Sequence, residues 1–401
     1  MPTSPRRRSK DRKEAIALVA AELFCARGFH NVAIEDIAQE VGITGPAIYR
    51  HFPTKQAVLA AAVRELGSRF AECVHAGARE AAPSDRLPAA LRALVRYALD
   101  RRTVARLYQW EGRCLDAGQQ AELAVPFDAA VRMLRELLLD LRPELGKQDS
   151  ALLVSAALSA IASPSTHRAS LSRSKAERTI LDCVTTVIAV HPPAPPRRTS
   201  SGRRRPDRLN LLPRRERLLA EAIRLFHERG YHQVSISDIG QAAGINASSV
   251  YTHFASKAEL LSAAYYRATS RVEHTTAAAL ADASTPAQAL SRLIDAYVEI
   301  TFDQADLAAV YVSESENLAP ADLRRLRAAQ RRHVDTWIGL VSELRPGEGA
   351  AELRFRTHAA LNIVTDLART AGPSVTEART AALLRPMLGL PALTGRSAAP
   401  A

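Results

Sequence analysis

The sequence is poor in cysteine and in aromatic residues, and these shortages exclude several classes of protein. Its 401 residues include only four cysteines, Cys25, Cys73, Cys114 and Cys183, all in the first half and in no CxxC or Cys/His pattern. We therefore expect no disulfide framework and no zinc site, and we interpret the cysteines as small buried apolar residues. Aromatic residues make up 5% of the chain, and its wealth of Ala, Leu and Arg favours an all-helical fold.

Long apolar runs and catalytic motifs are also missing. No run approaches the roughly 20 residues of a membrane-spanning helix, and MPTSPRRRSKDRK is not followed by the apolar core of a signal peptide. We expect a cytoplasmic, nucleoid-associated protein without a membrane partner. The sequence lacks GxSxG, Walker and GxGxxG motifs, and an HExxH-like run at His227 has Tyr231 in place of its second histidine. We expect neither an enzyme nor a metal site.

The net charge of +12 is concentrated in two short segments. Residues 1–13 carry six basic side chains against Asp11, and residues 197–217 carry nine arginines against two acids. The rest of the chain is neutral. Such runs are usually solvated, but two basic arms on a neutral body suit a polyanion. On charge alone, DNA and an anionic membrane surface both remain open.

A long internal repeat divides the chain into two halves. A shift of 202 residues superimposes Phe24 on Phe226, Gly42 on Gly244 and Tyr49 on Tyr251, and a shift of 203 superimposes 141–143 on 344–346. A period this long indicates a duplicated domain pair rather than a solenoid. The Pro-, Ser- and Arg-rich segment 191–213 between the copies cannot build a core and is interpreted as a linker and basic arm.

Each half begins with the pattern of a helix-turn-helix domain. Ile16, Val19, Ala20, Leu23 and Phe24 form one helical face that ends at Gly28. Short helices are then predicted from Ile34 to Val41 and from about Gly45 to Phe52, joined at Gly42 and capped by Thr44. The second copy predicts Ile236 to Ala243, Gly244, Asn246 as cap, and Ala247 to Phe254. We interpret Phe52 and Phe254 as core residues.

The segments AELFCARGFHNVAIEDIAQEVGITGPAIYRHFPTKQAVL and IRLFHERGYHQVSISDIGQAAGINASSVYTHFASKAEL each resemble the DNA-binding domain of the TetR/AcrR family. The resemblance implies two tandem units, each with a three-helix head and a helical ligand-binding body. The domains are then a basic arm 1–13, a first head 14–60, a first body 61–190, a linker 191–213, a second head 214–262, a second body 263–390 and a disordered tail 391–401.

The resemblance also implies the residues that contact double-stranded DNA. Base-edge contacts fall to the starts of the two recognition helices: Thr44, Gly45, Pro46, Ala47 and Arg50, and Asn246, Ala247, Ser248, Ser249 and Thr252. Phosphate contacts fall to Tyr49, His51, Lys55, Tyr251, His253 and Lys257, and the arms Arg6, Arg7, Arg8, Arg203, Arg204 and Arg205 follow the backbone or enter the minor groove. One departure is Ala33, where the family has the Ser or Thr cap that Ser235 supplies in the second head.

Amphipathic stretches at 126–142, 149–162, 321–344 and 350–371 correspond to the helices of the family's dimer interface. With two copies in one chain, that interface can form within a single-chain pseudodimer, so we favour a monomer acting on an asymmetric operator. A chain-level homodimer with four heads is the alternative. A non-specific architectural DNA-binding protein is a second alternative, although it would not need two bodies.

The bodies are expected to hold a ligand pocket, with candidates Tyr108, Trp110, Glu111, Arg113, Tyr311 and Glu314; ordinary helix surface is an equal reading of these residues. The chain is similar to the tandem regulators of mammalian-cell-entry operons in actinobacteria. That resemblance implies a ligand-responsive repressor of lipid-transport or lipid-metabolism genes. It implies no cofactor other than a small hydrophobic effector, lipid-like or an acyl-CoA.

Overall fold

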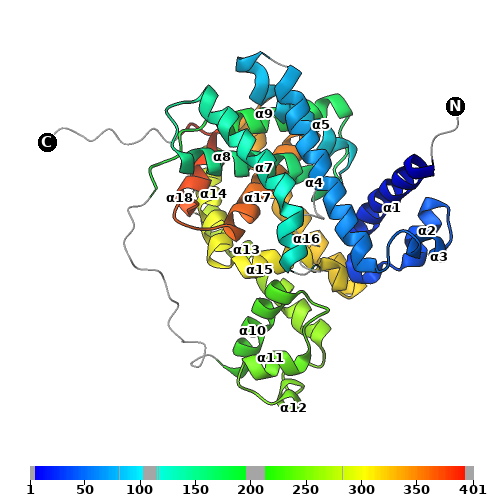
Figure 1. The fold of residues 1–401 in the computed structure, drawn as a ribbon. Coiled ribbons are helices and arrows are strands. Elements are labelled where there is room, and N and C mark those ends of the chain that lie inside the picture. Colours follow the sequence, from blue (N-terminus) through cyan, green and yellow to red (C-terminus); the bar gives the residue numbers. More distant parts are fainter. Residues whose placement is uncertain are drawn as a thin grey trace. The chain divides into compact units, whose positions relative to one another are not determined.

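A computed structural model describes residues 5–80, 82–102, 115, 117–195, 213–281 and 283–392 (Figure 1). All regular elements in these ranges are helices, and the β pairing that occurs there is an isolated bridge between Gly372 and Val375. The all-helical prediction is confirmed. The chain separates into two compact units, Met1–Val154 with Ile161–Val184, and Ser155–Ala160 with Thr185–Ala401.

The first half begins with a long helix, continues with three short helical segments and then forms mostly longer helices. In chain order they are α1 (Pro5–Arg27), η1 (Phe29–Asn31), α2 (Ile34–Val41), α3 (Gly45–Tyr49), α4 (Lys55–Glu80), η2 (Pro83–Asp85), α5 (Arg86–Asp100), α7 (Ala117–Leu141), α8 (Lys147–Ala162), η4 (Ser163–Ser165) and α9 (Arg173–Ala189). Helix α4 runs from the head into the body and packs against α1, α5 and α7.

The second half repeats this order. Its elements are α10 (Arg214–Arg229), α11 (Ile236–Ala242), α12 (Ala247–Val250), α13 (Lys257–Ala281), α14 (Pro286–Asp303), α15 (Ala305–Ser313), η6 (Ser315–Asn317), α16 (Pro320–Leu344), α17 (Ala350–Arg369) and α18 (Glu377–Met387). Helix α13 corresponds to α4, and α14 packs against α13, α16, α17 and α18. The four amphipathic stretches expected in the bodies lie in α7, α8, α16 and α17.

Helix α1 begins at Pro5 and so includes most of the segment 1–13; its role as a DNA-binding arm stays a prediction. One expectation about helix bounds is wrong. The recognition helices α3 and α12 end at Tyr49 and Val250, three or four residues earlier than expected. In the first head Pro53 keeps the helix from including Phe52, because the residue before a proline disfavours helical backbone.

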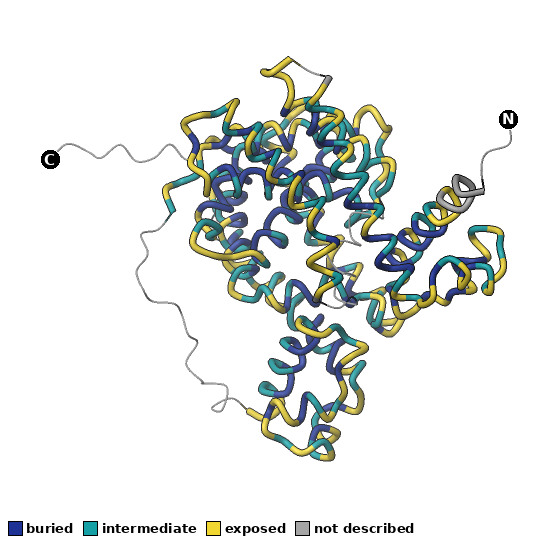
Figure 2. Tube along the Cα trace, viewed as in Figure 1, coloured by how far each residue is buried: buried dark blue, intermediate teal, exposed yellow. Residues whose placement is uncertain are grey.

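The second body holds two partly buried histidines, His333 and His358. His333 on α16 stacks on Tyr297, and its Nε2 accepts a hydrogen bond from the indole nitrogen of Trp337 at 3.1 Å. Burial lowers the pKa of His333 to about 4, and burial together with Arg354 lowers the pKa of His358 to about 4. In Figure 2, which has the view of Figure 1, many positions along the helices of this body are coloured as buried. Within the described residues no helix is long and apolar enough to cross a membrane.

Candidate nucleic-acid interface

The first helix of each head holds the other two through one apolar face. Ile16, Ala20 and Phe24 are fully buried in α1, and Leu218 and Phe226 are fully buried in α10, as the helical spacing predicted. Gly28 and Gly230 follow these helices, each with φ of +79°, which favours glycine because it has no Cβ. Their backbone N–H groups still donate to the carbonyls of Phe24 and Phe226, at 2.8 and 2.9 Å.

The turn between the second and third helices has the same geometry in both heads. Gly42 has φ of +74° and Gly244 has φ of +66°, and a Cβ at either position would meet no atom within 4 Å. Positive φ, rather than crowding, therefore favours glycine at both turns. After each glycine the chain turns back, since Ile43 N–H donates to Ala38 O and Ile245 N–H donates to Gly240 O.

The starts of α2 and α11 are capped differently. In the second head, Ser235 Oγ accepts the Asp238 N–H at 3.1 Å, and the Asp238 carboxylate accepts the Ser235 N–H at 2.7 Å. Hydrogen bonds from the Ser235 side chain and backbone lower the pKa of Asp238. In the first head, only the reverse bond from Ala33 N–H to Asp36 at 2.7 Å can form, because Ala33 has no hydroxyl.

The two phenylalanines at the ends of the recognition segments belong to the core, as predicted. Phe52 and Phe254 are 7% and 1% exposed. A cation from the first helix covers each ring: Lys13 Nζ lies 5.9 Å from the Phe52 centroid, and the Arg215 guanidinium lies 4.6 Å from that of Phe254. These two basic residues occupy equivalent positions of the repeat. Part of the positive charge in the basic segments thus packs on the heads.

Lys55 and Lys257, expected at phosphates, lie against the loop that precedes α2 or α11. Lys257 Nζ donates to the carbonyls of Tyr231 and Val234, both at 2.8 Å, and lies 4.3 Å from the centre of the Tyr231 ring. Burial lowers the pKa of Lys257. Lys55 Nζ lies 4.5 Å from the Phe29 ring and 3.5 Å from His30 O. An ammonium has three donors, so Lys257 keeps at most one for DNA.

The expected base-contacting ends of α3 and α12 are accessible. Thr44, Pro46 and Arg50 are exposed in the first head, with Gly45 and Ala47 partly covered; Asn246, Ser248 and Thr252 are exposed in the second, with Ala247 and Ser249 partly covered. Thr44 and Asn246 stand at the cap positions without capping through their side chains. Thr252 Oγ1 donates to Ser249 O at 2.7 Å. The Thr252 hydroxyl can therefore still accept a hydrogen bond but has no further proton to donate.

The expected phosphate contacts on these helices are aromatic. Tyr49 is 51% exposed and Tyr251 is 57% exposed, among the most exposed large side chains of the described residues. His51 and His253 are partly covered. Each head therefore exposes a tyrosine at the C-terminal end of its recognition helix, and phosphate contact by these four residues stays a prediction.

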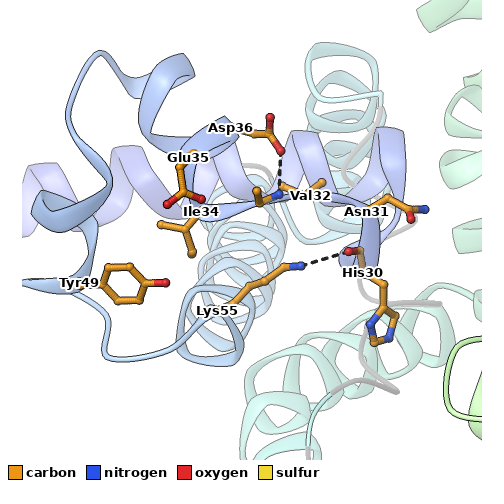
Figure 3. A pocket seen from close by; sticks show the side chains of 9 residues that line it. His30, Asn31, Val32, Ile34, Glu35, Asp36, Tyr49 and Lys55 are labelled. Carbon is orange, nitrogen blue, oxygen red and sulfur yellow. Dashed lines mark hydrogen bonds between the residues drawn. The ribbon is translucent and has the colours of Figure 1, made fainter.

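A shallow hollow lies beside Tyr49 in the first head. It encloses about 460 Å³ and is lined by residues 30–36, Tyr49 and Lys55. Figure 3 shows Tyr49 and Glu35 at one end of the hollow and His30 at the other. Glu35 was not among the predicted site residues. The available signal was that its repeat counterpart, 202 residues later, is the neutral Ser237.

Several predicted site residues lie outside the described residues. They are Arg203, Arg204 and Arg205 of the linker, and Tyr108, Trp110, Glu111 and Arg113 of the first body. Arg6, Arg7 and Arg8 lie in the first turns of α1, and their side chains are likewise not described.

The two remaining pocket candidates lie near the second head. The rings of Tyr311 and Tyr265 are 4.7 Å apart. Glu314 is 5% exposed, and its carboxylate accepts the Asn317 side-chain amide at 2.9 Å. Burial, and to a smaller extent the charge of Glu314, raises the pKa of Tyr231. The same charge raises the pKa of Lys257 and so offsets part of the lowering that burial causes there. Glu314 thus acts electrostatically on the head, and its role as a ligand contact stays a prediction.

A cavity of about 650 Å³ in the second body lies among α13, α14 and α18. Its lining includes Asp295, Glu299, Asp303 and Glu377. Both carboxylate oxygens of Asp295 accept hydrogen bonds from Arg385 at 2.7 Å, whereas the other three acids leave the cavity negative. The phosphates of an acyl-CoA would be repelled there. Among the described residues no group of three or more His, Cys, Asp or Glu could hold a metal ion.

Two accessible recognition helices on three-helix heads define a helix-turn-helix DNA-binding protein. The family of bacterial regulatory proteins of the tetR type matches residues 16–62 and again 218–264, and the tetracyclin repressor-like C-terminal domain matches 283–368. The chain is therefore a tandem member of the TetR family of transcriptional regulators.

Similar proteins include the HTH-type transcriptional activator FasR of Mycolicibacterium smegmatis, which is 39% identical over 71 residues, 18% of this chain and 32% of FasR. The match thus spans about a third of that relative. A TetR-family regulator from Bordetella parapertussis 12822 is 20% identical with a TM-score of 0.40, over 42% of this chain and 93% of that one. The regulator PfmR from Thermus thermophilus is 24% identical with a TM-score of 0.40, over 44% of this chain and 96% of that one.

Proposed function

We propose that this TetR-family regulator is a ligand-responsive repressor that binds an asymmetric operator as a single-chain pseudodimer. The observation that carries the proposal is the pair of heads, which repeat one skeleton but present different side chains at the ends of α3 and α12. Identical helices read identical half-sites, so operator symmetry mirrors protein symmetry. Gly45, Pro46 and Ala47 present apolar surface, whereas Asn246, Ser248 and Ser249 present hydrogen-bonding groups.

Pairing of the two bodies within one chain is supported by a buried hydrogen bond in the second unit. The Asn362 side-chain amide donates to the carbonyl of Ser159 at 2.8 Å, and both residues belong to that unit. Ser159 on α8 and Asn362 on α17 are 203 residues apart and are counterparts in the repeat. A contact between a residue and its own counterpart is what twofold packing produces at its axis. We infer that α8 and α17 pair as the interface helices of a pseudodimer.

The DNA-binding part is tested with the full chain and an operator chosen by sequencing the DNA that the purified protein retains. We expect the affinity to fall at least about a thousandfold between 50 and 200 mM salt, as six or more phosphate contacts require. Tyr49→Ala and Tyr251→Ala should each weaken binding about tenfold, the value of one hydrogen bond to a charged group. Tyr266→Ala is the matched control, because this exposed tyrosine lies on α13 and contacts Asp322. Salt-independent binding would contradict the proposal.

Stoichiometry and sequence preference distinguish the alternatives. Light scattering of the protein–DNA complex should find one chain per minimal operator, and two chains would favour the homodimer with four heads. Footprinting should find a sharply protected site, whereas uniform protection would favour an architectural DNA-binding protein. The retained DNA also tests whether the target genes serve lipid transport or lipid metabolism.

The effector part of the proposal is tested by release from the operator. We would add a long-chain acyl-CoA, a free fatty acid and a neutral sterol separately to the complex and follow fluorescence anisotropy. A lipid-like effector should lower the operator affinity, since a ligand that favours the unbound conformation opposes DNA binding by the same factor. If none of the three changes the affinity, the lipid-like effector is wrong and the DNA-binding proposal is unaffected.

A further inference from the structure

The first head carries, beside its recognition helix, a carboxylate that has no ion-pair partner among the described side chains. Glu35 is exposed in the first turn of α2, and its Oε1 lies 3.3 Å from the position that a Cβ would take at Gly45, the first residue of α3. Within the described part of this head, no side chain donates a hydrogen bond to Glu35. The ammonium of Lys55, which lines the same hollow, lies against Phe29 and His30 O.

The counterpart pair in the second head differs at both positions. Ser237 replaces Glu35, and Ala247 replaces Gly45. A contact of 3.3 Å is tighter than an ordinary van der Waals contact, so a methyl group on α3 would require the carboxylate to shift by a few tenths of an ångström. The glycine leaves space for the longer acidic side chain, and the alanine accompanies the shorter hydroxyl. The two heads therefore differ at both members of this contact.

Electrostatics decides what the carboxylate can do at this place. Tyr49, an expected phosphate contact, lines the hollow at the same end as Glu35. Glu35 therefore lies on the DNA-facing side of the proposed interface. Phosphates repel a carboxylate there, and a desolvated carboxylate without a donor is costly. In the major groove, cytosine offers its N4 amino group without a neighbouring acceptor, whereas the N6 amino group of adenine stands beside the acceptor N7. Cytosine is the base that suits Glu35.

We propose that Glu35 is a base-reading residue of the first head, whose carboxylate accepts a hydrogen bond from the N4 amino group of a cytosine. The inference rests on the proposed function and adds one required base pair to one half-site. The pair Glu35 and Gly45 acts as a unit, because Gly45 allows the carboxylate to approach the end of α3. The second head, with Ser237 and Ala247, has no such requirement.

The experiment selects operators from a randomised duplex library with the full chain and its variants. The wild type should require cytosine at one position of one half-site, with discrimination of about 5- to 150-fold, the range of one good base contact. Glu35→Gln should lose this requirement and move the preference towards adenine, the base that suits a side-chain amide. The double variant Ser237→Glu, Ala247→Gly should create a cytosine requirement in the other half-site. Ser249→Ala, which removes an expected base contact of the second head, should change the base preference in that half-site alone. This change identifies the half-site as that of the second head.

The outcomes separate this inference from the proposed function. If the wild type selects no sequence at all, the proposed function fails. If the wild type selects an operator but Glu35→Gln keeps every base preference and strengthens binding to all DNA equally, Glu35 is only repulsive and the inference is overturned. Thermal melting of each variant verifies that it is folded before selection, and Glu35→Ala provides a second, shorter substitution at the same exposed position.

Discussion

The two heads show which parts of a duplicated DNA-binding domain are free to change. The residues that set the backbone are shared: two glycines with positive φ, a buried phenylalanine covered by a cation, and a lysine against the loop before the second helix. The residues at the exposed ends of α3 and α12 are almost all different. Duplication has kept the scaffold and separated the two reading surfaces. The bodies differ as well, because the second body buries arginines such as Arg356 and Arg379.

The largest expected difference between the halves is the response of the second body to acid. His333 and His358 correspond to Ala130 and Ser155, which do not titrate. Because the pKa of His333 is about 4 in the folded state and about 6.5 when unfolded, the unfolded chain binds more protons between these values. The free energy of unfolding that depends on the neutral histidine is therefore fully present above about pH 6.5. It decreases as the pH is lowered, by about 3 kcal/mol at pH 4 for each histidine.

The acid response is measured by urea unfolding at several pH values. Trp337 is fully buried in the second body, so its fluorescence in a Trp110→Phe background reports that body alone. His333→Gln should reduce the slope of stability against pH below 6.5, because the amide does not titrate. An equal slope in both proteins would show that His333 is not the group responsible.

The next largest effect is an exchange of half-site preferences between the heads. Exchanging residues 44–50 with 246–252 should exchange the preferences, at about 1–3 kcal/mol for each base contact. Since a methyl at position 45 would crowd Glu35, the exchange should include positions 35 and 237. Operator selection is the measurement. The two heads would have the same base preference, contrary to this prediction, if the selected site were perfectly palindromic and base substitutions at mirror positions weakened binding equally.

A smaller effect is expected at the contact between the second and third helices. A Cβ at Gly240 would lie 2.7 Å from the carbonyl oxygen of Ile245, whereas its counterpart Ala38 already carries one. Gly240→Ala should destabilise the second head by about 1–2 kcal/mol, since overpacking outweighs the gain in helix propensity. Ala38→Gly should cost about 1 kcal/mol through that propensity. Amide hydrogen exchange in α11 and α2 measures both, and a stabilised Gly240→Ala protein would contradict the close approach.

The smallest expected effect concerns the caps of the second helices. Ser235→Ala should cost about 1 kcal/mol because Asp238 N–H loses its acceptor. Ala33→Ser should recover a similar amount in the first head, where Asp36 already accepts from residue 33. Exchange rates of the Asp238 and Asp36 amides provide the measurement. Exchange rates that are the same in the wild type and in both variants would mean that the caps do not distinguish the heads.

Local features of the sequence predicted most of the fold, and contacts between elements were harder to predict. The apolar spacing and Gly42 placed α2 at Ile34–Val41, because helix period and positive φ depend on residues close in the chain. The engagement of Lys257 by two carbonyls was not predicted, since its partners lie 23 and 26 residues away. For the same reason the approach of Glu35 to Gly45 emerged only from the folded head.

Gly240 also makes the difference between the two heads costly to remove. The heads are copies of one repeat, and at this position one copy has alanine and the other glycine. In the second head the turn has closed over the glycine, so a returning methyl group would meet the backbone oxygen of Ile245. A methyl group introduced at Gly240 would require the turn to move. In evolutionary terms, exchange of this one residue would not by itself give the second head the geometry of the first.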